Sequence, residues 1–426
     1  MTCGCCGPGS TGSEFTVKRE HCEALDRADP LRAMRERFAI PGKLIYLDGN
    51  SLGVLPKSVA QRISDTVVRQ WGATLIKSWN EHGWFELPRK VGDRIGRLIG
   101  APAGSVVAGD TISVNLFKLL GAALKLRPQR KVILSDSGNF PSDLYVAQGL
   151  RDFLDAGHEL CIVEPEEIMG AIDESVAVVM LTEVDYRGAR LHDMKAITAA
   201  AHGAGALTIW DLAHSAGALP VDLAGTDADL AVGCTYKYLN GGPGAPAFLY
   251  VRPDLQDKIA PPLAGWWGHE APFAFDLDYR PAPGILRNQC GTQPILAMAA
   301  LDAALDVWDD VDMNEVRAKS MALGKLFIDL AEARCGRLGV RLYGPRNMTE
   351  RGSHVSLHCP EGYAAMQALI AHGVIGDFRS PDLIRFGFTP LYTSYSEVWD
   401  AVDILARILD ERLWDAPQFL ARKAVT

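Results

Sequence analysis

The sequence has no apolar run long enough to cross a bilayer, and its N-terminus lacks the basic-then-apolar order of a secretory signal. It also has no excess of basic residues, since 43 Lys and Arg face 52 Asp and Glu and give a formal net charge of -9. An acidic balance of this kind argues against a nucleic-acid partner. We therefore expect a cytoplasmic protein that binds neither membranes nor nucleic acid.

Cysteine pairs at metal-binding spacing are missing from the interior of the sequence, where single cysteines stand at 161, 234, 290, 335 and 359. We expect reduced, mostly buried thiols and no metal site. The exception is the cluster of Cys3, Cys5 and Cys6, with Cys22 as the one nearby candidate for the fourth ligand that a structural metal needs. The surrounding Gly, Pro, Ser and Thr favour a disordered leader or tag over residues 1–15.

The length of 426 residues exceeds one ordinary core, while 48% hydrophobic and 22% charged residues are normal for a globular protein. We expect two unequal domains. Beyond the leader, the predicted division is an N-terminal segment packing with the small domain (16–60), a large cofactor-binding domain (61–305) and a small C-terminal domain (306–426).

Short β-branched runs alternate with helical stretches between residues 105 and 251. This alternation predicts an α/β fold with a mainly parallel sheet and helices on both faces. The predicted strands are 105–108, 131–135, 176–183, 207–211, 230–235 and 247–251. In this class ligands bind at the carboxyl ends of the strands, so functional residues should follow each run.

A helical stretch over 296–335 leads from this sheet into a second unit with a βαββα pattern. Its predicted strands are 354–358, 376–379 and 383–389, and its predicted helices are 362–372 and 396–409. The sequence therefore predicts a small C-terminal α/β domain packed closely against the large one.

Two charged residues end neighbouring predicted strands, Asp211 after 207–210 and Lys237 shortly after 230–235. A semi-buried lysine can lose its proton and form an imine, and a carboxylate can keep a pyridine nitrogen protonated. An isolated Asp at a strand end is often only a helix cap. Asp211 and Lys237 together, with His214 between them in the sequence, are a more specific signal. The pair predicts pyridoxal 5′-phosphate held as a Schiff base on Lys237.

Further candidates also have ordinary structural explanations. Thr111 begins a helix and could bind a phosphate or merely cap that helix. Phe140 could stack on a flat ring and Asp143 could bond to ring substituents, or they could be a core aromatic and a helix cap. Arg385 could hold a substrate carboxylate or face solvent.

Six strings of residues, in order along the chain, resemble kynureninase, and the resemblance runs from about residue 20 to the C-terminus. The strings are 46–53 (YLDGNSLG), 139–143 (NFPSD), 210–217 (WDLAHSAG), 235–244 (TYKYLNGGPG), 290–294 (CGTQP) and 385–392 (RFGFTPLY). The resemblance implies a fold-type-I pyridoxal-phosphate transferase fold with a large mainly parallel-sheet domain and a small C-terminal α/β domain. It also implies a homodimer with shared active sites.

Residue roles follow from the matching strings. Lys237 resembles the Schiff-base lysine, and Asp211 resembles the partner of the pyridine nitrogen. The residues similar to the phosphate shell are Thr111, Ile112, Tyr236, Trp266 and Thr292, with Thr292 expected from the other subunit. Those similar to residues around the ring are Phe140, Asp143, Thr182 and His214. Those similar to substrate-binding residues are Ser51, Trp79 and Arg385.

The implied activity is hydrolysis of the Cβ–Cγ bond of L-kynurenine to anthranilate and L-alanine, in tryptophan catabolism or in a biosynthetic route such as that to NAD. In this reaction Lys237 would remove the α-proton, and Tyr236 would donate a later proton. The 3-hydroxy derivative of kynurenine stays open as a second substrate.

Other functions fit the sequence less well. Residues 49–53 match G-x-S-x-G, but too little chain precedes Ser51 for a nucleophile elbow. Residues 242–247 match G-x-G-x-x-A, but they lead into a strand and not into a helix, which a dinucleotide site requires. Within the pyridoxal-phosphate class a desulfurase- or aminotransferase-like activity is the alternative. A non-catalytic binding protein of the same fold is a further alternative, which the intact set of site residues disfavours.

Overall fold

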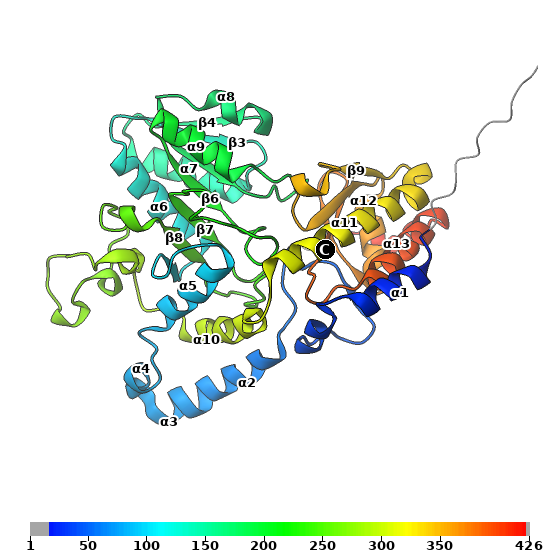
Figure 1. Cartoon of the computed structure of the whole chain (residues 1–426), viewed down its shortest axis with the longest axis horizontal. Coiled ribbons are helices and arrows are strands. Elements are labelled where there is room, and N and C mark those ends of the chain that lie inside the picture. Colours follow the sequence, from blue (N-terminus) through cyan, green and yellow to red (C-terminus); the bar gives the residue numbers. More distant parts are fainter. Residues whose placement is uncertain (1–16, 423–426) are drawn as a thin grey trace, which may run out of the picture.

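The computed structural model describes residues 17–422, so the leader or tag expected over residues 1–15 lies outside the described residues. Two α/β units lie side by side (Figure 1), and the larger holds a seven-stranded sheet of order β2-β8-β7-β6-β5-β3-β4. Its strands are β2 (Val106–Ala108), β3 (Val132–Asp136), β4 (Glu159–Val163), β5 (Val176–Thr182), β6 (Leu207–Asp211), β7 (Leu230–Gly233) and β8 (Phe248–Val251).

The predicted mainly parallel sheet is confirmed, because β3 to β7 pair in parallel and only β8 runs against its neighbours. The predicted strand over 230–235 was too long, since β7 ends at Gly233. The sequence reasoning missed β4, an edge strand whose residues are mostly exposed and half-buried.

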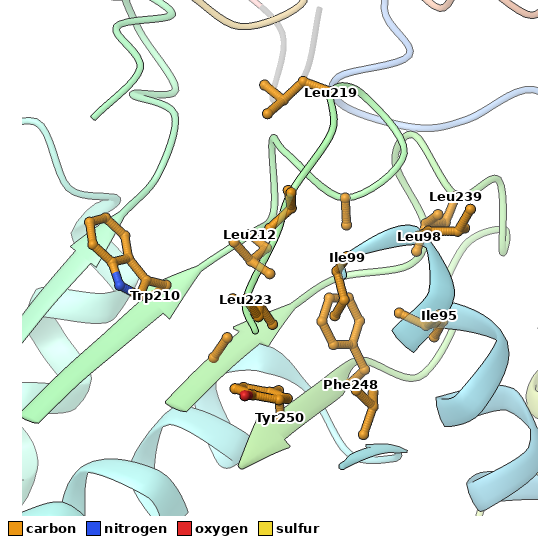
Figure 2. Close-up of a cluster of buried hydrophobic side chains, with 14 of the residues drawn as sticks. Ile95, Leu98, Ile99, Trp210, Leu212, Leu219, Leu223, Leu239, Phe248 and Tyr250 are labelled. Carbon is orange, nitrogen blue, oxygen red and sulfur yellow. The ribbon is translucent and has the colours of Figure 1, made fainter. Parts of the chain in front are cut away.

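Helices cover both faces of the large sheet, and alternate residues of each strand point to opposite faces. On one face α5 (Leu87–Leu98) and α9 (Met194–Ala204) pack in a core that includes Trp210 and Phe248. Figure 2 shows part of this core, with Ile95 of α5 near the strands. On the other face α6 (Ile112–Leu126) and α7 (Pro141–Leu154) pack in a second core. The short helix α8 (Ile168–Ala171) joins β4 to β5.

The smaller unit has an antiparallel sheet of order β12-β13-β10-β9. Its strands are β9 (Arg341–Tyr343), β10 (His354–His358), β12 (Asp377–Arg379) and β13 (Leu383–Gly387), and its helices are α11 (Met313–Cys335), α12 (Gly362–Ala371), α13 (Tyr395–Asp410) and α14 (Pro417–Leu420). The predicted βαββα core is therefore present. Strand β9 was missed, and the predicted strand 383–389 was too long.

The N-terminal segment lies against the smaller unit. Helix α1 (Arg19–Ala28) is beside α13 in Figure 1, and Arg19 forms an ion pair with Asp400. Strand β1 (Ile45–Tyr46) pairs in parallel with β11 (Val374–Ile375). These contacts support the proposed assignment of residues 16–60 to the small-domain side, and we keep the domain boundaries as a proposal.

An arm of short helices projects from the large unit (Figure 1). It consists of α2 (Lys57–Asp65), a π-helical turn (Thr66–Trp71), α3 (Gly72–Thr74) and α4 (Ser78–Glu81), and α2 packs against α10 (Ile295–Ala304). Between residues 17 and 422, no helix has the length and apolar character needed to cross a membrane.

Helix α5 packs directly on the backbone of β2, and this approach requires glycine at one position. A Cβ at Gly92 would lie 2.3 Å from the Val106 carbonyl oxygen, whereas a Cβ at Gly96, one turn later, would lie 3.5 Å from the Val106 Cγ2 atom. We expect Gly92→Ala to lower the free energy of unfolding by about 1–3 kcal/mol. Gly96→Ala should leave it unchanged or raise it by up to about 1 kcal/mol. Thermal unfolding midpoints of both variants test this, and an equally stable Gly92→Ala protein would contradict it.

Candidate active site

A cavity of about 750 Å³ lies at one edge of the large sheet. Strands β3, β5, β6 and β7 run in parallel, so their carboxyl ends meet at this edge. Side chains that follow these ends therefore converge on one space. Among the residues that line the cavity are the predicted Thr111, Ile112, Phe140, Asp143, Thr182, Asp211, His214, Tyr236, Lys237 and Thr292.

The amine of Lys237 lies 3.1 Å from Nε2 of His214. His214 is buried, and burial together with the nearby Lys237 cation holds the pKa of its ring well below the usual range. The ring is therefore neutral at physiological pH, and its Nε2 can accept a hydrogen bond from the Lys237 amine. The other ring nitrogen, Nδ1, is buried without a hydrogen-bond partner.

Two buried carboxyls lie near this amine. Burial raises the pKa of Asp211 to about 6, and the Lys237 cation opposes this rise. Burial and the neighbouring Asp211 raise the pKa of Asp143 further above its ordinary value. Asp211 Oδ1 accepts a hydrogen bond from the Ala213 backbone at 2.8 Å, whereas Asp143 Oδ2 has no partner. Of the two carboxyls, Asp143 is therefore the harder to ionise.

The start of α6 forms another wall of the cavity. Thr111 is the N-cap of this helix, and its hydroxyl accepts a 3.4 Å hydrogen bond from the Val114 backbone. Both interpretations of Thr111 are therefore compatible with its position, because a cap at a helix start also lies where backbone amides attract an anion. Across the cavity Phe140 meets Tyr186 edge to face at 5.0 Å between ring centroids.

Arg385 is not on the cavity wall but buried behind it. Its guanidinium pairs with Asp377, and it donates to the Tyr186 carbonyl at 2.6 Å and to the Ser51 hydroxyl at 3.2 Å. The idea that Arg385 is a solvent-facing strand residue is wrong, since only 1% of it is exposed. Ser51 lies with Arg385, next to the cavity residue Leu52.

Trp79 and Trp266 lie outside the cavity of their own chain. Both belong to an aromatic cluster that we call the arm cluster, in which each indole packs against Trp267 at 5.1 Å and 4.6 Å between ring centroids. The remaining members of the arm cluster are Trp84, Phe85 and Phe273. Thr292 lies on the cavity wall of its own chain, and its expected contribution from the other subunit stays a prediction.

Sequence reasoning missed three residues around the site. Tyr186 lines the cavity shortly after β5, where the strand-end rule could have found it. Asp377 pairs with Arg385 across two small-domain strands, and His354 packs its ring 5.3 Å from that of His214. Neither contact has a local sequence signal, because each depends on how distant strands come together.

Solved structures of the same fold share most of this architecture. A cysteine desulfurase from Thermococcus onnurineus NA1 superposes with a TM-score of 0.74 at 21% identity, covering 89% of this chain and 98% of the other. A cysteine desulfurase from Escherichia coli gives 0.75 at 18% identity with the same coverage. The enzyme C-DES, solved as a mutant with glycine covalently linked to its pyridoxal phosphate, gives 0.74 at 16% identity, covering 87% and 98%.

The chain therefore has the fold of these enzymes, with a lysine and a carboxylate on the wall of one cavity. Over 413 residues the chain is 53% identical to a kynureninase from Burkholderia pseudomallei strain 1106a and 52% identical to one from Pseudomonas fluorescens, covering 96% of this chain and 99% of each relative. The family description "Kynureninase C-terminal domain" matches residues 316–405. The chain belongs to the kynureninase family, whose members are hydrolases that act on carbon–carbon bonds.

Glu183, directly after β5, is a buried carboxyl with one oxygen unpartnered. Burial raises its pKa from 4.5 to about 7. A raised carboxyl pKa contributes stability that is present below about pH 4.5 and is lost as pH rises through 7. We expect Glu183→Gln to be more stable than the parent by about 1–3 kcal/mol at pH 8 and by less than about 1 kcal/mol at pH 5.

Thermal midpoints from pH 5 to pH 8 measure this difference. The exposed Glu174→Gln is the control and should match the parent at every pH. If the midpoints of Glu183→Gln and of the parent differ by the same amount at every pH, the Glu183 carboxyl does not titrate between pH 5 and pH 8.

Proposed function

We propose that the chain hydrolyses the Cβ–Cγ bond of L-kynurenine to give anthranilate and L-alanine, and that it accepts the 3-hydroxy derivative as a second substrate. The observation that carries the proposal is the placement of Lys237, Asp211 and His214 around one cavity in a chain of this family. Such a reaction belongs to tryptophan catabolism and to routes that supply NAD.

The residues of the cavity fit pyridoxal phosphate. The cavity offers an amine on Lys237, a carboxylate on Asp211, an aromatic face on Phe140 and a helix start at Thr111 and Ile112. Unpartnered buried atoms, Asp143 Oδ2 and His214 Nδ1, leave polar capacity for a ligand. When bound, this cofactor supplies an electron sink for charge that develops on the substrate.

The protein groups have separate tasks in this proposal. Asp211, ionised at neutral pH, holds a proton on the pyridine nitrogen by charge attraction. Lys237 Nζ binds the cofactor and, once released, accepts the proton from the substrate α-carbon. Burial raises the pKa of the Tyr236 phenol, so Tyr236 stays protonated and can donate a proton late in the reaction.

Substrate recognition would use residues outside the cavity wall. The guanidinium of Arg385 binds the α-carboxylate of the substrate, and Ser51 lies beside it. Trp79 contributes to the aromatic surroundings of the substrate ring. Since Trp79 and Trp266 lie away from the cavity of their own chain, both would serve the site of a second subunit.

We infer a homodimer with shared active sites from this placement. The arm and the 262–280 loop carry exposed apolar side chains, which monomeric proteins rarely gather on one surface. They are Val68, Trp71, Leu75, Ile76, Phe273, Phe275 and Leu277. A second subunit packed on this surface would place its cavity close to the arm cluster of the first subunit.

Desulfurase chemistry receives no support from the cysteines that the structure describes. Cys234 is the one described cysteine on the cavity wall, where it is buried and its thiol lies 3.7 Å from the Ala213 carbonyl. Burial raises the pKa of this thiol, so it is not a ready nucleophile.

Replacing the lysine tests the reaction and the cofactor together. We expect Lys237→Ala to lose the absorbance of lysine-bound cofactor and to form anthranilate at least about 10³-fold more slowly than the parent. Anthranilate fluorescence after addition of L-kynurenine measures the rate. The surface variant Lys325→Ala should behave as the parent. A parent that has the cofactor absorbance but forms no anthranilate would refute the substrate assignment.

Subunit mixing tests the shared site. Trp266→Ala should weaken cofactor binding, and Lys237→Ala should be inactive, because each lacks one part of every site. Co-expression of both chains should restore about a quarter of the parent activity, since half of the dimers are mixed and each has one intact site. Mixed dimers purified through two tags, one on each chain, should show about half of the parent activity. No recovery, or an active monomer by mass measurement, would contradict the shared site.

A further inference from the structure

The guanidinium of Arg385 is held on two of its edges. Nε donates to Asp377 Oδ1 at 2.9 Å, and Nη2 donates to Asp377 Oδ2, so one edge is a bidentate pair. On the other edge Nη1 donates to the Tyr186 carbonyl at 2.6 Å and Nη2 to the Ser51 hydroxyl at 3.2 Å. Tyr186 lines the cavity, so this second edge is the one that contacts a residue of the cavity wall.

Asp377 is itself fixed by several contacts. It is 2% exposed and faces Arg385 directly across the paired strands β12 and β13. Its Oδ2 also accepts hydrogen bonds from the Ser51 hydroxyl at 2.8 Å and from Arg379 at 2.7 Å. A carboxylate held in this way restricts Arg385 to one orientation, because a bidentate pair fixes the plane of the guanidinium.

The Ser51 hydroxyl bridges the acid and the base. It donates to Asp377 while it accepts from Arg385 Nη2, so it occupies a position where a carboxylate oxygen of a ligand could accept instead. Rotation of one hydroxyl away from Nη2 would free that donor without breaking the Asp377–Arg385 pair.

We propose that Asp377 is a positioning residue, which fixes one edge of Arg385 so that the opposite edge binds the substrate carboxylate when the Ser51 hydroxyl moves aside. This inference rests on the proposed carboxylate-binding role of Arg385. Asp377 acts only through Arg385 and does not touch the substrate. Its loss should therefore weaken ligands that carry a carboxylate and spare those that lack one.

Spectral titration of the cofactor-loaded enzyme with L-alanine and L-alaninamide tests this selectivity. The two ligands share one skeleton, and the amide lacks the negative charge. We expect Asp377→Asn to weaken L-alanine binding at least about tenfold and L-alaninamide binding less than about twofold. Asp382→Asn, on the same hairpin but paired with the surface His358, should change neither.

A second pair of proteins separates positioning from folding. Asp377→Asn leaves Arg379 and Arg385 with one less counter-charge, which destabilises a buried cluster. The double variant Asp377→Asn with Arg379→Gln restores the charge balance, and it should show the same selective loss of L-alanine. Arg379→Gln alone keeps the bidentate Asp377–Arg385 pair, so it should weaken L-alanine binding much less than Asp377→Asn does. Equal weakening of both ligands, or unchanged L-alanine binding, would overturn the proposal.

The titration does not depend on cleavage of L-kynurenine, so the two proposals can fail separately. A parent that forms no anthranilate but prefers L-alanine to its amide would refute the substrate and leave the test of Asp377 intact. A parent that binds L-alanine and its amide equally would overturn the positioning role, because Arg385 would then not bind the carboxylate.

Discussion

The attraction between the Lys237 ammonium and the buried carboxylate of Asp211 is the interaction on which the site depends. An isolated charge at this depth is costly, and the Lys237 charge opposes the rise that burial causes in the pKa values of Asp211 and Asp143, whereas Asp211 raises the pKa of Asp143 further. The strand order makes this compensation available, because β6 and β7 are adjacent parallel strands and deliver Asp211 and Lys237 to the same edge. His214 stays neutral there, so it binds the amine without adding a competing charge.

Sequence patterns predicted the parts of the fold that are buried and continuous. The strand over 207–211 has the predicted bounds because every residue in it is buried, which makes the apolar run unambiguous. Strands β4, β9 and β11 are short or carry exposed residues, so hydrophobic pattern alone does not mark them. The strand-end rule also led to Asp211 and Lys237, because a residue that follows a buried parallel strand lies at the carboxyl end of the sheet.

Contacts between distant segments could not be predicted from these local sequence patterns. The Asp377–Arg385 pair depends on the register of β12 and β13, and a shift of one residue would point one of the side chains to the opposite face. Trp79 and Trp266 could be singled out only by resemblance, and their place in the arm cluster follows from the packing of the arm against a remote loop. Local sequence therefore specifies the cofactor end of the site better than the substrate end.

Arg385 belongs to a strand of the smaller unit, whereas Lys237 and Asp211 belong to the sheet of the larger one. A substrate held by its amino group at one end and by its carboxylate at the other would join the two units through its own α-carbon. The relative position of the two units would then set the orientation of the bonds at that α-carbon. Small rigid-body shifts of one unit would change which bond is aligned for cleavage, so reaction choice could be altered by residues far from the chemistry.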